Sequence, residues 1–322
     1  MISVIVPAYN SEKTIDSCIK SLLNQSFPKK QYEIIIVDDG SSDKTAEVAS
    51  KYCVRLFKRP HKGPAAARNF GAKHARGNIL LFTDSDCVPD KRWIKLMTEP
   101  FKDEQIVGVS GAYRTLNKNK PVARFAGYEI EERHKKLAKQ KYTDFIGTFS
   151  AGYKKNIFLK AGGFDTKFGM ASGEDPDLSF NISKLGGKMI FQPKAFVYHN
   201  HPDTLWKFLR QKFWRGYWRV RLYKKHTEKM FKHSYTPKSL LLEEALTGLT
   251  FLSLLLGVVN MIPLYAGLIL LFLIFSMTLP FSARTFKKDR MVGVLSPFIM
   301  ILRNISTGIG IICGLIFSKG LF

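Results

Sequence analysis

Two aspartates two residues apart, Asp84 and Asp86, directly follow the apolar run 79–83. Carboxylates with this spacing at a strand end can bind a hard divalent cation and leave positions open for diphosphate oxygens and water. A solvated surface turn is the alternative explanation of the pair. The other polar segments of the chain decide between the two.

An aromatic ring and a carboxylate follow the first two apolar runs. Residues 2–7 lead into Tyr9, and residues 32–37 lead into Asp39. Strands of a parallel sheet end at one edge, where open α/β proteins bind their ligands. Tyr9 can pack against a nucleotide base, and Asp39 can accept a hydrogen bond from an imide N–H of that base. A turn and N-cap cluster is the alternative explanation of residues 38–43.

Small residues and two cations open another predicted helix. Residues 62–69 read Lys-Gly-Pro-Ala-Ala-Ala-Arg-Asn. The N–H groups at a helix start bind phosphate, and we expect Lys62 and Arg68 to add positive charge there. A tightly packed helix start is the alternative.

Three carboxylates crowd beside a glycine in residues 173–178, Gly-Glu-Asp-Pro-Asp-Leu. Crowded acids raise one another's pKa, which makes a carboxylate usable as a general base. We expect Asp177 to cap a helix over residues 178–185 and Glu174 to orient the substrate.

Two histidines, His199 and His201, follow the strand-like run 189–191. Their spacing puts both rings on one side of an extended chain, so one of them can complete a metal shell. A structural role for a lone histidine is the alternative.

The elements that position these residues alternate between strand and helix patterns. Strand 2–7, helix 14–24 and strand 32–37 form one βαβ unit, and strand 54–57, helix 64–75 and strand 79–83 form a second. This alternation predicts an α/β domain with a Rossmann-like, mostly parallel sheet.

The C-terminal part has a membrane composition, because residues 245–283 contain no charge. A single helix of that run would be roughly 58 Å long, about twice the hydrocarbon thickness of a bilayer, so the run must fold back. We expect three spans, at residues 245–261, 264–281 and 292–317. A buried helical subdomain is the alternative. The expected domains are a catalytic domain over 1–202, a basic aromatic interfacial helix and linker over 203–240, and an α-helical membrane domain over 241–322.

The net charge of +24 is concentrated next to the expected spans. Residues 204–232 carry ten Lys or Arg against the single acid Glu228, interleaved with eight aromatics, which suits anionic headgroups or a lipid-linked acceptor. This position, and the lack of a nucleic-acid module pattern, argue against nucleic-acid binding. The basic loop 284–290 predicts that this loop and the catalytic domain lie on the cytoplasmic side of the cell membrane, and residues 1–4 suggest no export signal. The four cysteines lack metal-ligand spacing and are expected to be free thiols.

These segments, in this order, resemble the family 2 inverting glycosyltransferases with the GT-A fold. The resemblance covers residues 2 to about 201, including the linking stretches 150–152 and 162–165. It implies a nucleotide-diphosphate sugar as donor and Mn²⁺ or Mg²⁺ as cofactor. The residue roles that it implies are base binding by Pro7, Tyr9 and Asp39, donor and metal binding by Asp84 and Asp86, base catalysis by Asp175, and metal binding by His199, with His201 close enough to be confused with it.

The chain departs from the processive synthases of that family. They carry Gln-x-x-Arg-Trp, whereas residues 211–215 read Gln-Lys-Phe-Trp-Arg, with the last two residues reversed. We therefore expect a membrane-bound inverting glycosyltransferase that moves one sugar to a hydroxyl of a lipid-linked or glycan acceptor.

Three other functions remain open. Polyprenyl-phosphate (dolichyl-phosphate-type) sugar synthases resemble the first 110 residues equally well, but as a group they lack the Gly-Glu-Asp segment. A hydroxyl acceptor needs a base, whereas a phosphate is already ionised. A nucleotidyltransferase would release pyrophosphate instead of a nucleoside diphosphate, and a membrane scaffold would bind the donor without turnover.

Overall fold

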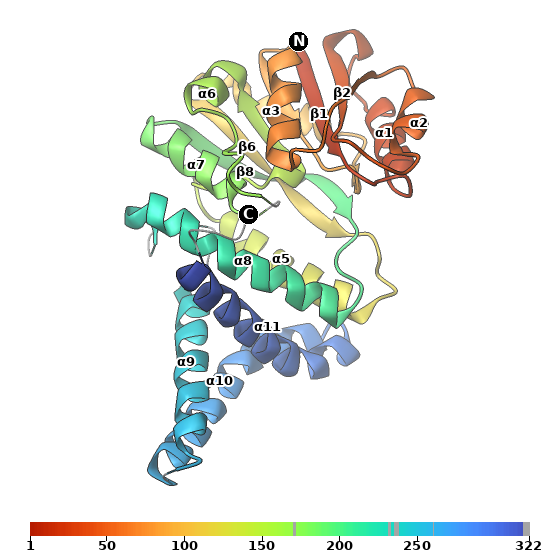
Figure 1. The fold of residues 1–322 in the computed structure, drawn as a ribbon. Coiled ribbons are helices and arrows are strands. Elements are labelled where there is room, and N and C mark those ends of the chain that lie inside the picture. Colours follow the sequence, from red (N-terminus) through yellow and green to blue (C-terminus); the bar gives the residue numbers. More distant parts are fainter. Residues whose placement is uncertain (170–171, 231–232, 235–237, 260, 318–322) are drawn as a thin grey trace. The chain divides into compact units, whose positions relative to one another are not determined.

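The computed structural model describes residues 1–169, 172–230, 233–234, 238–259 and 261–317 (Figure 1). The chain divides into two compact units: Met1–Leu116 with Glu129–Asn200, and Asn117–Tyr128 with His201–Phe322. Residues 117–128, which the sequence assigned to the catalytic domain, therefore group with the C-terminal unit. Parts of the expected linker 203–240 lie outside the described residues.

The first unit is built on an eight-stranded sheet with the order β3-β2-β1-β4-β7-β6-β8-β5. Its first four strands in that order are parallel, β7 runs antiparallel to both β4 and β6, and β5 runs antiparallel to β8. This confirms the expected α/β class with a mostly parallel sheet. The strands are β1 (Ile2–Ala8), β2 (Tyr32–Asp38), β3 (Arg55–Lys58), β4 (Ile79–Phe82), β5 (Cys87–Pro89), β6 (Ile106–Thr115), β7 (Ala151–Lys154) and β8 (Lys188–His199).

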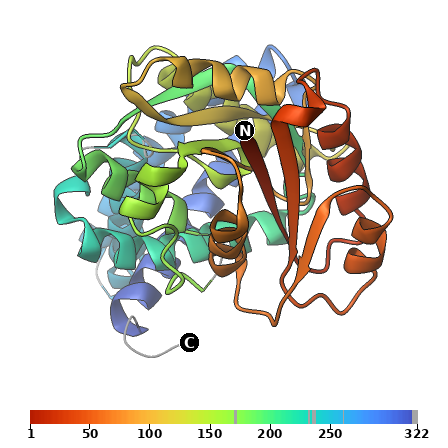
Figure 2. The same ribbon diagram turned by 90° about the horizontal axis from the view of Figure 1, so that it is seen from above.

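Helices cover both faces of the sheet (Figures 1 and 2). On β1, Val4 and Val6 belong to one hydrophobic cluster, with α1 and α4, whereas Ile5 belongs to another, with α3, α6 and α7. Alternate side chains of a strand point to opposite faces, so burial on both faces explains why these strands read as continuous apolar runs. The helices of this unit are α1 (Ile15–Leu23), α2 (Thr45–Ser50), α3 (Pro64–His74), α4 (Trp93–Thr98), α6 (Lys155–Lys160) and α7 (Glu174–Lys184), and α5 (Pro121–Leu137) has residues in both units.

Parallel pairing brings the loops after β1, β2 and β4 together. Ala8 pairs with Asp38, and Ile5 pairs with Phe82. Beyond the strands, the hydroxyl of Ser11 lies 2.8 Å from that of Ser85. Three segments that the sequence analysis singled out thus meet at one edge of the sheet.

Helix α7 begins earlier than the sequence predicts. Its first residue is Glu174 and its N-cap is Gly173, which has no side chain that could cap the helix and whose φ of 111° suits glycine. The expectation that Asp177 caps a helix starting at residue 178 is therefore wrong. Asp177 instead lies fully buried within the helix.

The second unit is helical. Two of its helices, α10 (Met261–Phe286) and α11 (Arg290–Phe317), are candidate membrane helices by length and apolar composition. They overlap the second and third expected spans. The first expected span overlaps α9 (Lys238–Leu256) and includes residue 260, which lies outside the described residues. Helix α8 (Leu205–Lys225) contains most of the basic aromatic segment.

Replacement of Gly71 should loosen the contact between α3 and β1. A Cβ at Gly71 would lie 2.4 Å from Cγ2 of Ile5, so Gly71→Ala should lower the free energy of unfolding by about 1–3 kcal/mol, the usual cost of overpacking. Thermal melting of the detergent-solubilised protein measures this. Lys73→Ala is the matched control, because Lys73 is exposed on the same helix. Equal melting temperatures for the two variants would contradict the close packing.

Candidate active site

The ring of Tyr9 has a partner that the sequence analysis missed. Tyr9 and His61 stack with ring centroids 4.1 Å apart, and Tyr9 is 48% exposed. Nδ1 of His61 also lies 3.0 Å from the main-chain oxygen of Asp39. The only sequence signal was a histidine directly before the Lys-Gly-Pro segment. An exposed aromatic pair beside a carboxylate is suited to stack with a planar ligand.

The carboxylate of Asp39 is buried and binds the start of α3. It accepts hydrogen bonds from the main-chain N–H of Lys62 at 3.1 Å and of Gly63 at 2.7 Å. Nε of Arg59 lies 3.4 Å from one carboxylate oxygen, and Nδ1 of His61 lies 3.0 Å from the other. A carboxylate at a helix start is stabilised by the N–H groups and the helix dipole. Asp39 thus takes N–H groups that the sequence analysis assigned to phosphate, and a base N–H would have to share its oxygens.

Two other predicted donor-binding residues lie at this corner of the sheet. The side chain of Lys62 is exposed, and Pro7 is half-buried on β1, where it pairs with Val37 of β2. The ammonium group of Lys62 is therefore accessible to an anionic ligand.

Arg68 is buried between two carboxylates. Its side chain is 2% exposed, Nη1 donates to Oε1 of Glu174 at 3.0 Å, and Nη2 donates to Oδ1 of Asp84 at 2.7 Å. The guanidinium also lies over the ring of Phe164. The sequence suggested that Arg68 adds positive charge for a phosphate. In this arrangement its guanidinium instead binds Asp84 and Glu174. It joins the loop after β4 to the start of α7.

The charges around Arg68 keep it protonated. Burial alone would lower the pKa of Arg68, but the charges of Asp84, Glu174 and Asp175 outweigh burial and raise it above its ordinary value. Burial raises the pKa of the Glu174 carboxyl, and the charge of Arg68 opposes that rise. One cation therefore balances the acids brought together here.

The predicted base, Asp175, lies in the first turn of α7. Its side chain is half-buried, and its main-chain oxygen accepts a hydrogen bond from the Ser179 hydroxyl at 2.8 Å. The influence of its charge on Arg68 places it in the same electrostatic cluster as Asp84. Its neighbour Glu174 is committed to Arg68. Of these two adjacent acids, Asp175 is thus the more accessible.

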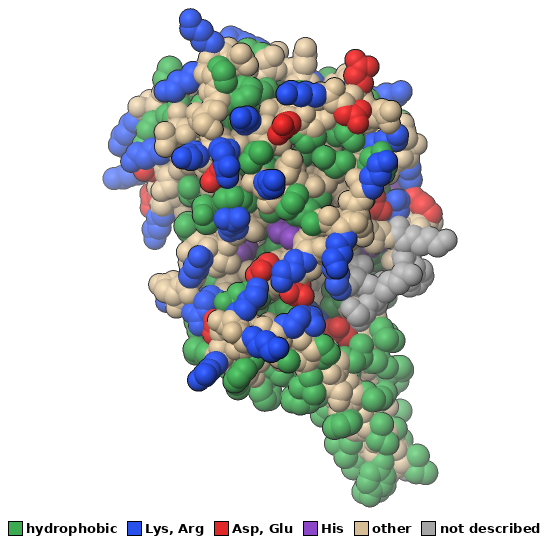
Figure 3. All heavy atoms as spheres, turned by 180° about the vertical axis from the view of Figure 1, so that it is seen from behind, with side chains coloured by type: hydrophobic (Ala, Val, Ile, Leu, Met, Phe, Trp, Pro, Cys, Tyr) green, Lys and Arg blue, Asp and Glu red, His purple; other side chains and the backbone are tan. Residues whose placement is uncertain are grey.

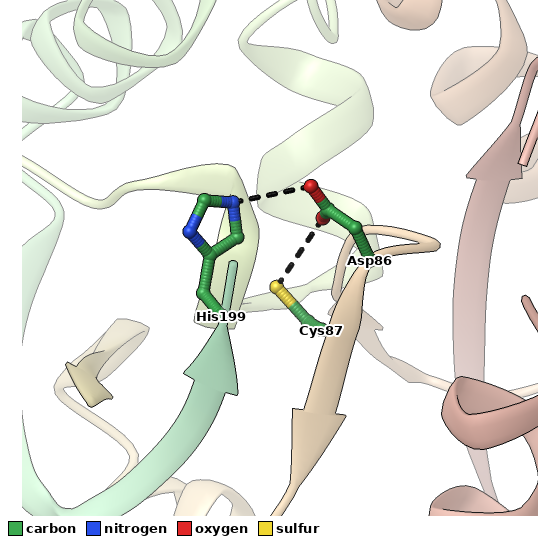
Figure 4. Close-up of side chains that lie close together, drawn as sticks. All are labelled: Asp86, Cys87 and His199. Carbon is green, nitrogen blue, oxygen red and sulfur yellow. Dashed lines mark hydrogen bonds and ion pairs between the residues drawn. The ribbon is translucent and has the colours of Figure 1, made fainter. Parts of the chain in front are cut away.

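A second cluster contains Asp86, Cys87 and His199, drawn in Figure 4. Strand pairing assembles it, because Cys87 of β5 pairs with His199 of β8. Nε2 of His199 lies 3.2 Å from Oδ2 of Asp86, and one ligand atom from each of the three residues lies within 4.8 Å of the others. Burial opposes ionisation of Asp86, but the hydrogen bond and charge of His199 lower the pKa of Asp86 below its ordinary value.

The donor atoms of this cluster fit a divalent metal. A carboxylate oxygen and an imidazole nitrogen are suitable ligands for Mn²⁺, and Mg²⁺ accepts the carboxylate. The Cys87 thiol is fully buried, and burial raises its pKa well above the ordinary value, so it stays protonated and is a poor ligand. Among the described residues, this candidate group contains His199 and not His201. His201 lies in the second unit, where its main-chain N–H donates to Oδ1 of Asn117 at 3.0 Å.

Loss of either proposed ligand should weaken metal binding. We expect Asp86→Asn and His199→Ala each to weaken Mn²⁺ binding by at least about tenfold, as even outer-shell partners of metal ligands have such effects. Titration calorimetry with Mn²⁺ measures this. Cys87→Ala is the control and should bind Mn²⁺ as the unmodified protein does. Loss of binding in the control alone would assign the metal to the thiol.

The Arg68 ion pairs should be strongly coupled. Arg68→Met leaves Glu174 buried beside an apolar group and should lower the free energy of unfolding by about 3–5 kcal/mol. Glu174→Gln should offset much of that loss in the double variant, because no carboxylate then remains unpaired at that position. Thermal melting of the single and double variants measures the coupling, and Arg92→Met, at an exposed ion pair with Asp90, should change little. Strictly additive effects would refute the coupling.

Comparison with known proteins finds similarity to glycosyltransferases. Residues 3–160 match the sequence profile described as Glycosyl transferase family 2. The probable glycosyltransferase YdaM of Bacillus subtilis (strain 168) is 28% identical over 241 residues, which cover 68% of this chain and 53% of YdaM. A Methanococcus voltae protein is 24% identical over 237 residues, covering 65% of this chain and 70% of that protein, and is named dolichyl N-acetyl-alpha-D-glucosaminyl phosphate 3-beta-D-2,3-diacetamido-2,3-dideoxy-beta-D-glucuronosyltransferase.

The fold has a matching solved structure. The mannosyltransferase PcManGT from Pyrobaculum calidifontis, solved in complex with GDP-Man and Mn²⁺, superposes with a TM-score of 0.65 at 19% identity, covering 99% of this chain and 88% of PcManGT. The match to YdaM is less complete, because the matched residues span only about half of the length of YdaM. The edge of the sheet that collects Tyr9, Asp39, Asp84 and Asp175 is thus part of a GT-A fold, and through residues 3–160 the chain belongs to glycosyl transferase family 2.

Proposed function

We propose that this protein is a membrane-bound, metal-dependent inverting glycosyltransferase that moves one sugar from a nucleotide-diphosphate donor to a hydroxyl of a lipid-linked acceptor. The observation that carries the proposal is the contact of Arg68 with both Asp84 and Glu174. That contact brings the donor-binding loop and the segment of the proposed base, Asp175, into one cluster.

The donor would lie along the edge of the sheet where β1, β2 and β4 end. Its base would stack on Tyr9 and contact Pro7, with the oxygens of Asp39 as acceptors. Lys62, whose side chain is exposed, would meet the diphosphate, and Asp84 would orient the sugar and diphosphate. PcManGT was solved with GDP-Man, which supports a nucleotide-diphosphate sugar as the class of donor.

Asp86 and His199 would hold the metal. A bound Mn²⁺ or Mg²⁺ would supply Lewis-acid stabilisation of the leaving diphosphate, where negative charge develops. A carboxylate is ionised at neutral pH and an imidazole is largely neutral, as metal binding requires. The Mn²⁺ in the PcManGT complex supports the use of a divalent metal.

The sugar would be transferred in a single displacement. The acceptor oxygen attacks the anomeric carbon, the bond from that carbon to the diphosphate oxygen breaks, and the nucleoside diphosphate leaves. Asp175 takes the proton of the acceptor hydroxyl as the new bond forms. Glu174 cannot share this task while it is paired with Arg68, so it orients the segment instead.

The acceptor is proposed to be lipid-linked. The Methanococcus voltae relative is named for transfer to a dolichyl-phosphate-linked sugar, and its name specifies position 3 of that sugar. The candidate membrane helices α10 and α11 support a place at the cell membrane, and the basic loop 284–290 favours the cytoplasmic side for the catalytic domain. A polyprenyl-phosphate sugar synthase is the second candidate, and the role of Asp175 distinguishes the two.

Asp175→Asn should separate catalysis from donor binding. Asn has nearly the same shape but cannot take a proton, so kcat should fall by roughly 10² to 10⁴ while donor affinity stays nearly unchanged. Nucleoside diphosphate release from a panel of nucleotide sugars, with polyprenyl-linked sugars as acceptors, measures kcat. Titration with the donor measures its affinity, and Asp103→Asn, at an exposed turn, is the control.

Each other result points to a different assignment. Loss of donor affinity would make Asp175 a structural or metal-shell residue. A kcat within a few-fold of the unmodified enzyme would favour an ionised lipid phosphate as acceptor. Release of pyrophosphate would identify a nucleotidyltransferase.

A further inference from the structure

Helices α8 and α11 pack side by side. Small residues of one helix lie against main-chain oxygens of the other. The residue numbers of the contacting positions increase in the same direction along both helices, so the two helices run parallel. Ser306 approaches Leu209, Gly310 approaches Phe213 and Gly314 approaches Tyr217, each with the same offset in residue number, and Gly216 of α8 also lies against the main-chain oxygen of Thr307. A Cβ on Gly310 would lie 2.0 Å from the Phe213 oxygen, which means that the backbones themselves are in contact.

Helix α8 is too basic to enter hydrocarbon. It contains Lys and Arg at eight positions and neither Asp nor Glu. Four of those cations, Arg210, Lys212, Arg215 and Arg219, lie within residues 209–220, the stretch of α8 that contacts α11. If residues 306–317 of α11 crossed the bilayer, these cations would have to enter it beside them, which is strongly unfavourable.

Ion pairs join α8, α9 and α11 at one place. Nη2 of Arg303, in the middle of α11, donates to Oε2 of Glu243 at 2.7 Å. Nη1 of Arg219, on α8, donates to the neighbouring Glu244 at 3.0 Å. Glu243 and Glu244 lie near the start of α9, so the middle of α11 lies at the level where α9 begins.

Beyond this level, α9 and α10 form an antiparallel apolar hairpin. Gly257 lies against Leu264, and Gly267 lies against Leu254. No charge occurs from residue 245 to residue 283. Figure 3 shows that the surface of this hairpin is almost entirely hydrophobic, and Val259 and Phe272 are 90% and 69% exposed. Such a surface needs lipid around it.

Helix α11 has one apolar face. Its buried residues are mostly small or polar, whereas a stripe of exposed apolar side chains recurs every three or four residues. The stripe consists of Val294, Phe298, Leu302, Ile305, Ile309, Ile312 and Ile316. A helix with one apolar stripe and a basic helix on its other side has the character of an interfacial helix.

We propose that α11 lies in the plane of the membrane surface, with its apolar stripe on the acyl chains of an anionic bilayer, and that α8 covers its other side. The α9–α10 hairpin is then the element that enters the hydrocarbon. Residues 292–317 are not a span, and the chain end stays on the same side as the basic loop 284–290. This inference rests on the membrane association proposed above, and its partner is a lipid surface.

Depth measurements test the proposal. Single cysteines replace Val294, Ile305 and Ile316 in turn and carry an environment-sensitive fluorophore. Only Cys53 and Cys313 need removal, because Cys18 and Cys87 are buried in the core. The full chain is reconstituted into vesicles of phosphatidylglycerol and phosphatidylcholine, and quenchers fixed at known depths locate each probe. A probe at Phe272, on the hairpin, is the control for a deep position.

An in-plane α11 gives one shallow depth for all three stripe probes, whereas Phe272 is deep. A spanning α11 puts its end probes roughly 33 Å apart along the helix, so their depths differ and Ile305 lies near the bilayer centre. That result would overturn the placement of α11 and leave membrane association intact. Failure of the unlabelled chain to sediment with the vesicles would overturn both proposals.

A second measurement does not depend on probes in the stripe. A cysteine in place of Lys288 and an epitope added after Phe322 are tested with impermeant reagents on sealed vesicles. The proposal requires both to be reached from the same side. Access from opposite sides would establish α11 as a span.

Discussion

The candidate active site depends on the two ion pairs of the buried Arg68 guanidinium. The guanidinium contacts Asp84, which follows a central strand, and Glu174, which begins α7. These residues are far apart in sequence, and repulsion between their carboxylates would separate them without a shared cation. Arg suits this position better than Lys, because its planar fork presents several donors in fixed directions. Such buried pairs add little net stability, but the loss of one partner is costly, so their value lies in the geometry they impose.

Two glycines allow this interaction to form. Gly71 has no Cβ and lets α3 approach Ile5 on β1, and the same helix carries Arg68. Gly173 adopts a positive φ, which lets α7 begin at Glu174. The Asp86–His199 pair is positioned independently, by the register of β5 against β8. The contact between Asp84 and the segment of the proposed base therefore depends on helix placement, whereas the proposed metal ligands depend on strand pairing.

The features that could be predicted from the sequence are those that leave a local pattern in it. The apolar runs identified β1, β2 and β4, because strands buried on both faces leave a continuous signal. The same local reading assigned the helix-start N–H groups before Arg68 to phosphate. In the structure, Asp39 binds those groups, and Arg68 turns to a carboxylate on α7. Contacts over such separations leave no local pattern, and neither does the stacking of His61 on Tyr9. The start of α7 was misplaced because an N-cap was sought among acidic residues, whereas glycine geometry sets it.

Hydrophobicity likewise identifies membrane-associated segments, but it does not tell whether a helix crosses the bilayer or lies in the plane of its surface. Helix α11 has a composition suitable for a span, but it packs on α8, which is distant in sequence. On insertion scales, a Lys or Arg at the bilayer centre costs about 2.5–3.5 kcal/mol, so two of the α8 cations at that depth would cost about 5–7 kcal/mol. That is comparable to the whole stability of a domain, about 5–15 kcal/mol. Near an anionic surface the sign reverses, because each cation there gains about 1 kcal/mol. The charge of α8, and not the hydropathy of α11, therefore decides where the two helices lie.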